Sequence, residues 1–208
     1  MYSEEYFAEM LLRLRAVNLR TYPPYVWASG ILSPIYTDNR ILISFPEEIK
    51  QIITALASII QKNISGVFGF AGTATAGIPW AAWLAQEFDV PMIFVRSSAK
   101  IHGKENLIEG KITTGMEYVV VEDVISTGKS AIHSVNAVRD AGGKAQHCIS
   151  IFSYEFSDAQ KKFQEQNCRL HSLLNFSTLV RKAIEMNYLS ESEKESIFLL
   201  KENPTQWK

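Results

Sequence analysis

The sequence has few cysteines, no excess of charge of either sign and no long apolar run. Its two cysteines, Cys148 and Cys168, form no CxxC pair, so we predict neither a disulfide framework nor a zinc site. His133, His147 and His171 have no visible partner and are predicted to be structural. Lysine and arginine total 21 against 22 acidic residues, which provides no global field for nucleic acid or an anionic membrane. No apolar run approaches the roughly 18 residues of a membrane-spanning helix.

The opening segment, MYSEEYFAEMLLRLRAV, carries glutamates where a signal peptide would carry basic residues. We therefore expect a cytoplasmic protein with reduced thiols. Its apolar positions recur at helical spacing, which predicts a helix through about Val17. With 208 residues, 47% of them hydrophobic and 21% charged, the chain is typical of one globular domain. We expect a single domain over residues 1–208.

Short, continuous apolar runs, each closed by small residues, occupy the middle of the chain. Continuous rather than alternating hydrophobicity predicts strands that are covered on both faces. Helical patterns precede or separate these strands, which predicts an α/β fold, a parallel sheet flanked by helices. We place strands at 66–70, 91–95, 118–121 and 147–152, and helices at about 46–62, 76–88 and 129–141. The tail after about Ser157 is expected to be helical, polar and packed on the outside.

Two segments are unsuited to long regular elements. Residues 21–40, TYPPYVWASGILSPIYTDNR, contain prolines and glycine that favour a loop with short extended pieces. Residues 96–115, RSSAKIHGKENLIEGKITTG, are basic and have few apolar side chains to bury. A long polar segment of this kind is either a functional lid or a solvated surface loop.

The motif VVVEDVISTGKSA, residues 119–131, ends in a way that resembles a nucleotide-binding loop. A P-loop, GxxxxGK[ST], would need glycine where this chain has Asp123, and Glu122 with Asp123 would repel a triphosphate. Two carboxylates at the end of a buried strand can instead accept hydrogen bonds from ribose hydroxyls. The turn at 126–130 leads into a helix N-terminus, which suits one phosphate monoester. We predict a ribose 5-phosphate site, the alternative being a simple helix cap.

This arrangement resembles the phosphoribosyl-diphosphate motif of type I phosphoribosyltransferases. Three further segments, SGILSPIYTDNR (29–40), AGTATAGIPWAAW (71–83) and VRSSAKIHGKENLIEGK (95–111), resemble the other signature blocks of the orotate phosphoribosyltransferase family. The resemblance implies a type I phosphoribosyltransferase fold in which residues about 1–45 form a small hood over the base. It also implies a homodimer with shared active sites that uses Mg²⁺. Such an enzyme joins orotate to phosphoribosyl diphosphate, giving orotidine 5'-monophosphate and pyrophosphate in pyrimidine biosynthesis.

The resemblance also assigns residues. It implies catalytic roles for Lys100, His102 and Asp123. Because negative charge accumulates on the departing pyrophosphate, cations in the basic segment suit this reaction. Orotate is expected beside Ser126, Tyr36, Thr37 and Arg40, and Mg²⁺ is expected to be held mainly through substrate, near Glu122 and Asp123. The residues expected to bind phosphoribosyl diphosphate are Arg96, Lys100, His102, Glu122, Asp123, Val124, Ile125, Ser126, Thr127, Gly128, Lys129 and Ser130.

Several features leave alternatives open. Arg40 could pair with the orotate carboxylate or form a surface salt bridge. The small residues of AGTATAGIP suit either a pyrophosphate nest or close packing. Family members often carry lysines where this chain has Ala28, Leu32, Ala76, Ser97 and Ser98, and an arginine is missing from SIFSYEFSD. The protein could therefore transfer the sugar to another nucleobase, or bind phosphoribosyl diphosphate as a non-catalytic regulator.

Overall fold

The computed structural model describes residues 2–27, 30–66, 69–98, 107–205 and 207. Predictions for Ala28, Lys100 and His102 therefore lie outside the described residues. The centre of the molecule is a six-stranded sheet with strand order β10-β9-β8-β5-β6-β7. Strands β10 to β6 run parallel, and β7 pairs antiparallel with β6 at one edge. Their bounds are β5 (Gly69–Thr73), β6 (Met92–Val95), β7 (Ile108–Glu109), β8 (Glu117–Ile125), β9 (Lys144–Ser153) and β10 (Arg169–Asn175).

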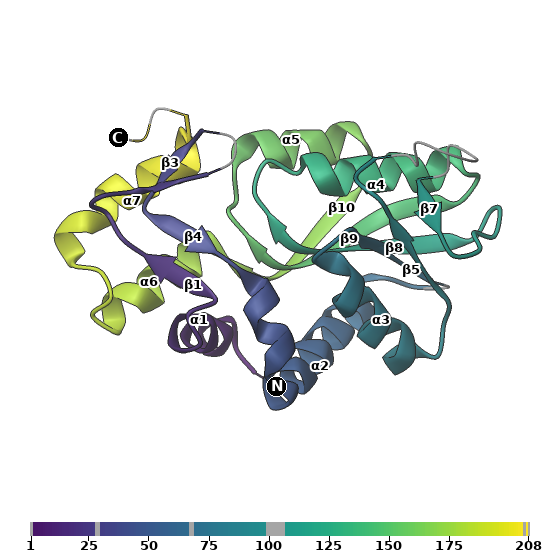
Figure 1. Ribbon diagram of the computed structural model, residues 1–208, viewed down its shortest axis with the longest axis horizontal. Helices are drawn as coiled ribbons and strands as arrows, with labels where there is room; N and C mark the ends of the chain where they lie inside the picture. The colour runs from purple at the N-terminus through teal and green to yellow at the C-terminus, as the bar shows by residue number, and fades with distance from the viewer. Residues whose placement is uncertain (1, 28–29, 67–68, 99–106, 206, 208) are drawn as a thin grey trace.

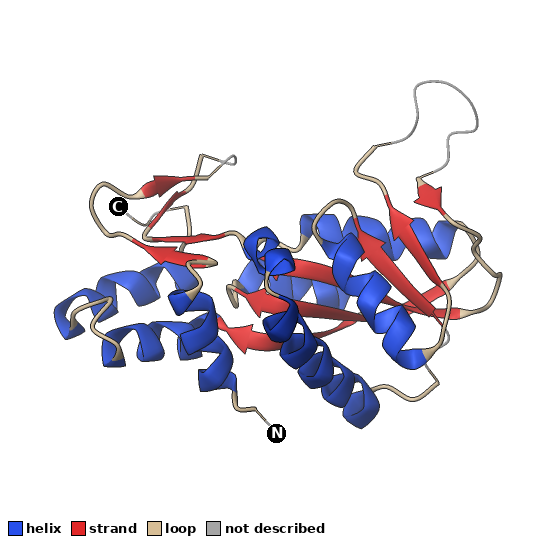
Figure 2. Ribbon diagram, turned by 60° about the horizontal axis from the view of Figure 1, so that its bottom comes forward, coloured by secondary structure: helices blue, strands red, loops and turns tan. Residues whose placement is uncertain are grey.

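Helices cover both faces of this sheet, which confirms the predicted α/β class. Helices α4 (Lys129–Asp140) and α5 (Ser157–Glu165) lie along one side, and α2 (Pro46–Asn63) and α3 (Gly77–Phe88) lie along the other (Figures 1 and 2). The apolar run of β8 is buried on both faces, as its composition predicts. Helix α2 begins at a proline, has two glutamates in its first turn and buries one isoleucine- and leucine-rich stripe.

The N-terminal segment forms a separate layer of short elements beside the sheet. It contains α1 (Glu4–Arg13), the antiparallel pair β1 (Val17–Leu19) and β4 (Ile35–Thr37), and the pair β2 (Tyr25–Val26) and β3 (Leu32–Ser33). The 3-10 helix η1 (Asn39–Ser44) then leads into α2. The first helix ends at Arg13 rather than Val17, because Arg15 adopts a left-handed conformation and Val17 pairs with Thr37.

The tail after Ser157 is only partly as predicted. It supplies strand β10 as well as helices α6 (Phe176–Glu185) and α7 (Lys194–Glu202), with the 3-10 turn η2 (Glu191–Glu193) between them. Helix α6 buries Phe176, Leu179 and Val180, so it belongs to the core and is not a polar surface helix. It packs against α1, and α7 lies on the same side of the molecule (Figure 1). Within the described residues, no helix is both long and apolar enough to cross a membrane.

Candidate active site

The carboxyl end of β8 leads through a tight turn into α4. Gly128 adopts a left-handed conformation at the N-cap of α4, and this leaves the first amides of the helix free to meet an anion. A Cβ at Gly128 would lie 3.3 Å from the ring of Phe163, so α5 backs the turn closely. From the same helix, Lys162 Nζ donates a hydrogen bond of 2.9 Å to the carbonyl oxygen of Thr127. We call residues 126–130 the phosphate turn.

One buried and one partly buried carboxyl group precede this turn. Glu122 is 5% exposed, and its oxygens accept hydrogen bonds from Ser130 Oγ at 2.8 Å and from the Asp123 amide at 3.2 Å. Burial raises the pKa of Glu122 well above its ordinary value, and the negative charge of Asp123 adds to this. Burial also raises the pKa of Asp123. In the described part of the chain neither carboxyl forms a salt bridge, so both can accept hydrogen bonds from sugar hydroxyls or contact a hydrated cation.

Asn39 connects the N-terminal segment to the end of β8. Its Nδ2 donates to the main-chain oxygen of Asp123 at 3.0 Å. The side chain is fully buried, and its Oδ1 has no hydrogen-bond partner within the described structure. Sequence reasoning missed this residue because an asparagine in a loop carries no local signature of a contact 84 residues away.

A small pocket of about 180 Å³ lies beside the phosphate turn. It gathers side chains from β4, from the end of β8 and from the residue after β9, which are far apart in sequence. Four of its lining residues belong to the predicted set, whereas Trp27 and Tyr154 were not predicted. The lining residues are Trp27, Tyr36, Thr37, Val124, Ser126 and Tyr154. The predicted Tyr36 and Thr37 therefore lie next to the predicted Ser126.

Arg40 does not line this pocket. Its guanidinium binds both carboxylate oxygens of Asp38, at 2.6 and 2.9 Å, and its side chain is 63% exposed. Hydrogen bonding from Arg40 lowers the pKa of Asp38. Of the two interpretations of Arg40 from the sequence, the structure contains the surface salt bridge.

Of the basic residues predicted to meet the diphosphate, the structure describes Arg96. Arg96 follows β6 and pairs with Glu109 at 3.3 Å. Gly77, at the start of α3, approaches the carbonyl of Val121 so closely that a Cβ there would overlap it. This observation supports the close-packing interpretation of AGTATAGIP. Within the described ranges, no three His, Cys, Asp or Glu side chains converge as a metal centre.

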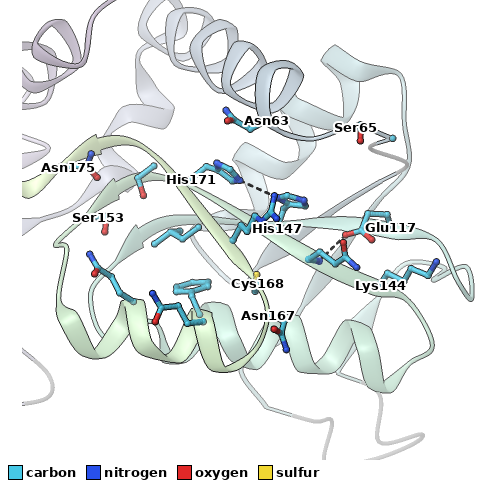
Figure 3. A pocket seen from close by; sticks show the side chains of 18 of the residues that line it. Asn63, Ser65, Glu117, Lys144, His147, Ser153, Asn167, Cys168, His171 and Asn175 are labelled. Carbon is cyan, nitrogen blue, oxygen red and sulfur yellow. Dashed lines mark hydrogen bonds between the residues drawn. The ribbon is translucent and has the colours of Figure 1, made fainter.

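A larger hollow of about 1290 Å³ lies elsewhere, along β9, β10 and α5 (Figure 3). It is lined by none of the residues predicted to bind substrate. His147 and His171 line it and contact each other, with Nδ1 and Nε2 3.2 Å apart, so these two predicted structural histidines are partners of each other. The chemistry of the side chains, and not the size of the hollow, therefore places the candidate site at the phosphate turn and the small pocket.

Comparison with known proteins identifies the family of the chain. The profile of the family described as "Phosphoribosyl transferase domain" matches residues 44–172, so the chain is a member of the phosphoribosyltransferase class. The orotate phosphoribosyltransferase of Coxiella burnetii is 48% identical over 200 residues, which cover 96% of each chain. The chain thus belongs to the orotate phosphoribosyltransferase family.

Solved structures share the fold. The orotate phosphoribosyltransferase of Aeropyrum pernix has a TM-score of 0.72 and 28% identity, with 85% of this chain and 98% of that chain covered. UMP synthase of Leishmania donovani has a TM-score of 0.82 at 20% identity, and 96% of this chain matches 42% of that longer one. These likenesses confirm the predicted type I phosphoribosyltransferase fold.

Proposed function

We propose that the protein transfers the phosphoribosyl group of phosphoribosyl diphosphate to orotate, giving orotidine 5'-monophosphate and pyrophosphate in pyrimidine biosynthesis. The observation that carries this proposal is the direct contact between the phosphate turn and the small pocket, since Ser126 belongs to both. A nucleotide needs a phosphate site, a ribose site and a base site in this order. The names of the relatives at high identity support the choice of orotate.

In this proposal each group of residues handles one part of the substrate. The phosphate turn binds the 5-phosphate through free amides and hydroxyls. Glu122 and Asp123 accept hydrogen bonds from the ribose hydroxyls, and the pocket holds the pyrimidine next to the sugar carbon that is attacked. Holding both reactants in line removes much of the entropic cost of their meeting. Arg96, Lys100 and His102 oppose the charge of the departing pyrophosphate.

Mg²⁺ fits this site as a partner of the substrate. Glu122 and Asp123 are the described carboxylates that could contact the cation or its bound water, and it would neutralise charge on the diphosphate. We further propose that two copies of the chain share active sites, with Lys100 or His102 reaching the partner's diphosphate. A cytoplasmic location and the absence of nucleic-acid and membrane partners also belong to the proposal.

An assay of base choice tests the function. The protein, Mg²⁺ and phosphoribosyl diphosphate are mixed with orotate, uracil or adenine, while absorbance and pyrophosphate release are followed. We expect pyrophosphate release with orotate. Asp123→Asn should reduce it strongly, whereas Asp140→Asn, the same change at an exposed position at the end of α4, should not. Release with uracil or adenine alone would reject orotate as the substrate, and binding without release would indicate a regulator.

A phosphoribosyltransferase for another base is the second candidate, and one observation favours it. Among the described residues that line the pocket, none is a lysine or arginine. The carboxylate of orotate would then rely on hydroxyl donors, main-chain amides or residues outside the lining set. An uncharged pyrimidine such as uracil would not need such a partner.

A further inference from the structure

The pocket contains a pair of hydroxyl groups that joins the N-terminal segment to the sheet. Thr37 Oγ1, at the end of β4, lies 2.9 Å from Tyr154 Oη, which follows β9. Tyr154 is 2% exposed, whereas Thr37 is only partly buried. Both side chains line the pocket, and Thr37 is the more exposed of the two.

The surroundings of Tyr154 restrict where its proton can go. Aromatic rings enclose the phenol, with centroids 4.9 Å away for Trp27 and Phe152 and 5.4 Å away for Phe156. Thr37 is the hydrogen-bond partner that the described structure provides for the phenol hydroxyl. Burial raises the pKa of Tyr154, although hydrogen bonding with Thr37 partly offsets this, so the phenol keeps its proton at neutral pH. The distance alone allows either hydroxyl to donate. Because a buried phenol needs an acceptor for its proton, and Thr37 Oγ1 is the acceptor that the described structure offers, we assign Tyr154 as the donor of this pair.

The hydroxyl groups of Thr37 and Tyr154 carry two protons, and one of these protons forms the hydrogen bond between the two residues. Since the Tyr154 proton occupies that bond, the Thr37 proton is directed elsewhere. Within the described residues, no hydrogen-bond partner holds the hydroxyl of Ser126 or Tyr36 in one orientation. The indole N–H of Trp27 is already donated to the main-chain oxygen of Ile35 at 3.2 Å. Thr37 is thus the hydroxyl of this pocket whose donor role is fixed by a neighbour.

We propose that Tyr154 is a positioning residue that commits the Thr37 hydroxyl to donate a hydrogen bond to an oxygen of the bound pyrimidine. This inference rests on the proposed function, because it assumes that the pocket holds the base. Tyr154 acts through Thr37 and need not touch the base itself. A fixed donor loses no orientational freedom on binding, so it favours a base with a carbonyl or carboxylate oxygen at that place.

Calorimetric binding of orotidine 5'-monophosphate and, separately, of phosphoribosyl diphosphate tests this role. Thr37→Val and Tyr154→Phe should each weaken binding of orotidine 5'-monophosphate by about tenfold, a typical loss for one hydrogen bond to a charged or polar ligand. Thr37→Ser keeps a hydroxyl and should retain most of the affinity. The double variant should bind no more weakly than Thr37→Val, because Tyr154 acts only through Thr37. Affinity for phosphoribosyl diphosphate, which has no base, should stay within about twofold throughout.

Tyr118→Phe is the matched control. Tyr118 is also fully buried, but its hydroxyl accepts a hydrogen bond from the Thr113 amide at 3.0 Å near the start of β8. Removal of the Tyr118 hydroxyl should leave the affinity for orotidine 5'-monophosphate unchanged. Melting temperatures show whether every variant is folded. Unchanged affinity in Tyr154→Phe, additive losses in the double variant, or a parallel loss of phosphoribosyl diphosphate binding would each overturn the inference. Failure of the unaltered protein to bind orotidine 5'-monophosphate would reject the proposed function together with it.

Discussion

At the scale of single residues, Glu122 is buried and Asp123 partly buried, and neither forms a salt bridge in the described structure. Burial and the charge of Asp123 raise the pKa of Glu122, so the folded protein holds a proton there more tightly than the unfolded chain does. The contribution of Glu122 to stability is therefore most favourable below its ordinary pKa of 4.5 and declines as the pH rises towards the folded value. At neutral pH the buried carboxyl group of Glu122 therefore lowers the free energy of unfolding.

Glu122→Gln should therefore stabilise the fold at neutral pH while it lowers turnover. Removing a buried, poorly compensated charge should raise the free energy of unfolding by roughly 1 kcal/mol, or about 2–4 °C in Tm for a chain of this size. Thermal unfolding without ligand at pH 7 and near pH 4 measures this. The gain should shrink at the lower pH, where the glutamate is protonated in both states. If Glu122→Gln raised the free energy of unfolding at pH 4 by as much as at pH 7, or by more, the charge of the carboxyl group would not be the cause of the stabilisation.

At the scale of elements, α5 supports the phosphate turn from behind. Lys162 is partly buried and donates to the Thr127 carbonyl, and in the described structure it forms no salt bridge. The cation thus adds positive potential to a turn that must hold a phosphate dianion.

Lys162→Met should raise the KM for phosphoribosyl diphosphate by about fivefold, or ~1 kcal/mol, since one hydrogen bond from a charged group is lost. The KM for orotate should change little. Lys161→Met changes the exposed neighbouring lysine of the same helix and is the control. Initial rates at varied concentrations of each substrate separate the two constants. A similar effect of both substitutions would point to general electrostatics and not to the turn.

A second connection ties the C-terminal helices to the end of β9. One carboxylate oxygen of Glu155 accepts a hydrogen bond from the Ser177 amide at 2.8 Å, and the other accepts one from Lys201 Nζ at 3.1 Å. Burial alone would raise the pKa of Glu155, but the bonds from Ser177 and Lys201 outweigh it and the pKa is lowered. The stabilisation is then present above the ordinary pKa of 4.5 and is lost as the pH falls through the lowered folded value.

Glu155→Gln should reduce the free energy of unfolding by about 1–2 kcal/mol at pH 7. The difference from the unaltered protein should narrow as the pH falls below 4.5. Urea unfolding at several pH values measures this, with the exposed Glu165→Gln as the control. A reduction in the free energy of unfolding that does not depend on pH would show that the shape of the side chain, and not its ionised carboxylate, matters at this position.

The sequence predicts some elements far better than others. The strand and helix around Glu122 were predicted because a fully apolar run followed by a glycine turn is a strong local signal. The end of the first helix was misplaced because the left-handed Arg15 depends on the pairing of β1 with β4. Strand β10 was missed because RLHSLLN, at the edge of the sheet, is only partly buried and has no continuous apolar run. Trp27, Asn39 and Tyr154 entered the site only through contacts between distant segments, which local patterns do not encode.

At the scale of the whole molecule, both ends of the chain build the layer beside the sheet. Thr21 donates to Glu193 at 2.7 Å, and Glu4 accepts from the Asn175 amide at 2.7 Å. The hood expected from residues about 1–45 therefore has C-terminal residues as neighbours. The pocket lies where this layer meets the sheet, so its shape depends on both.

The proposed sharing of active sites between two chains has a specific test. Lys100→Ala and Asp123→Asn should each lower turnover at least tenfold, because each removes a group that stabilises charge or holds the sugar. If Lys100 acts on the partner's substrate, mixing the two inactive variants should restore about a quarter of the normal activity through mixed dimers with one intact site. As the control, each variant is taken through the same mixing procedure on its own. No recovery, with subunit exchange confirmed by mass, would place Lys100 in its own chain's site.

The most direct test of the central claim is a crystal structure of the protein with orotidine 5'-monophosphate. The account predicts the phosphate at residues 126–130, the ribose hydroxyls at Glu122 and Asp123, and the base against Trp27, Thr37 and Val124. A nucleotide seated instead in the hollow along β10, or one bound with both carboxyl groups turned away from its sugar, would contradict it.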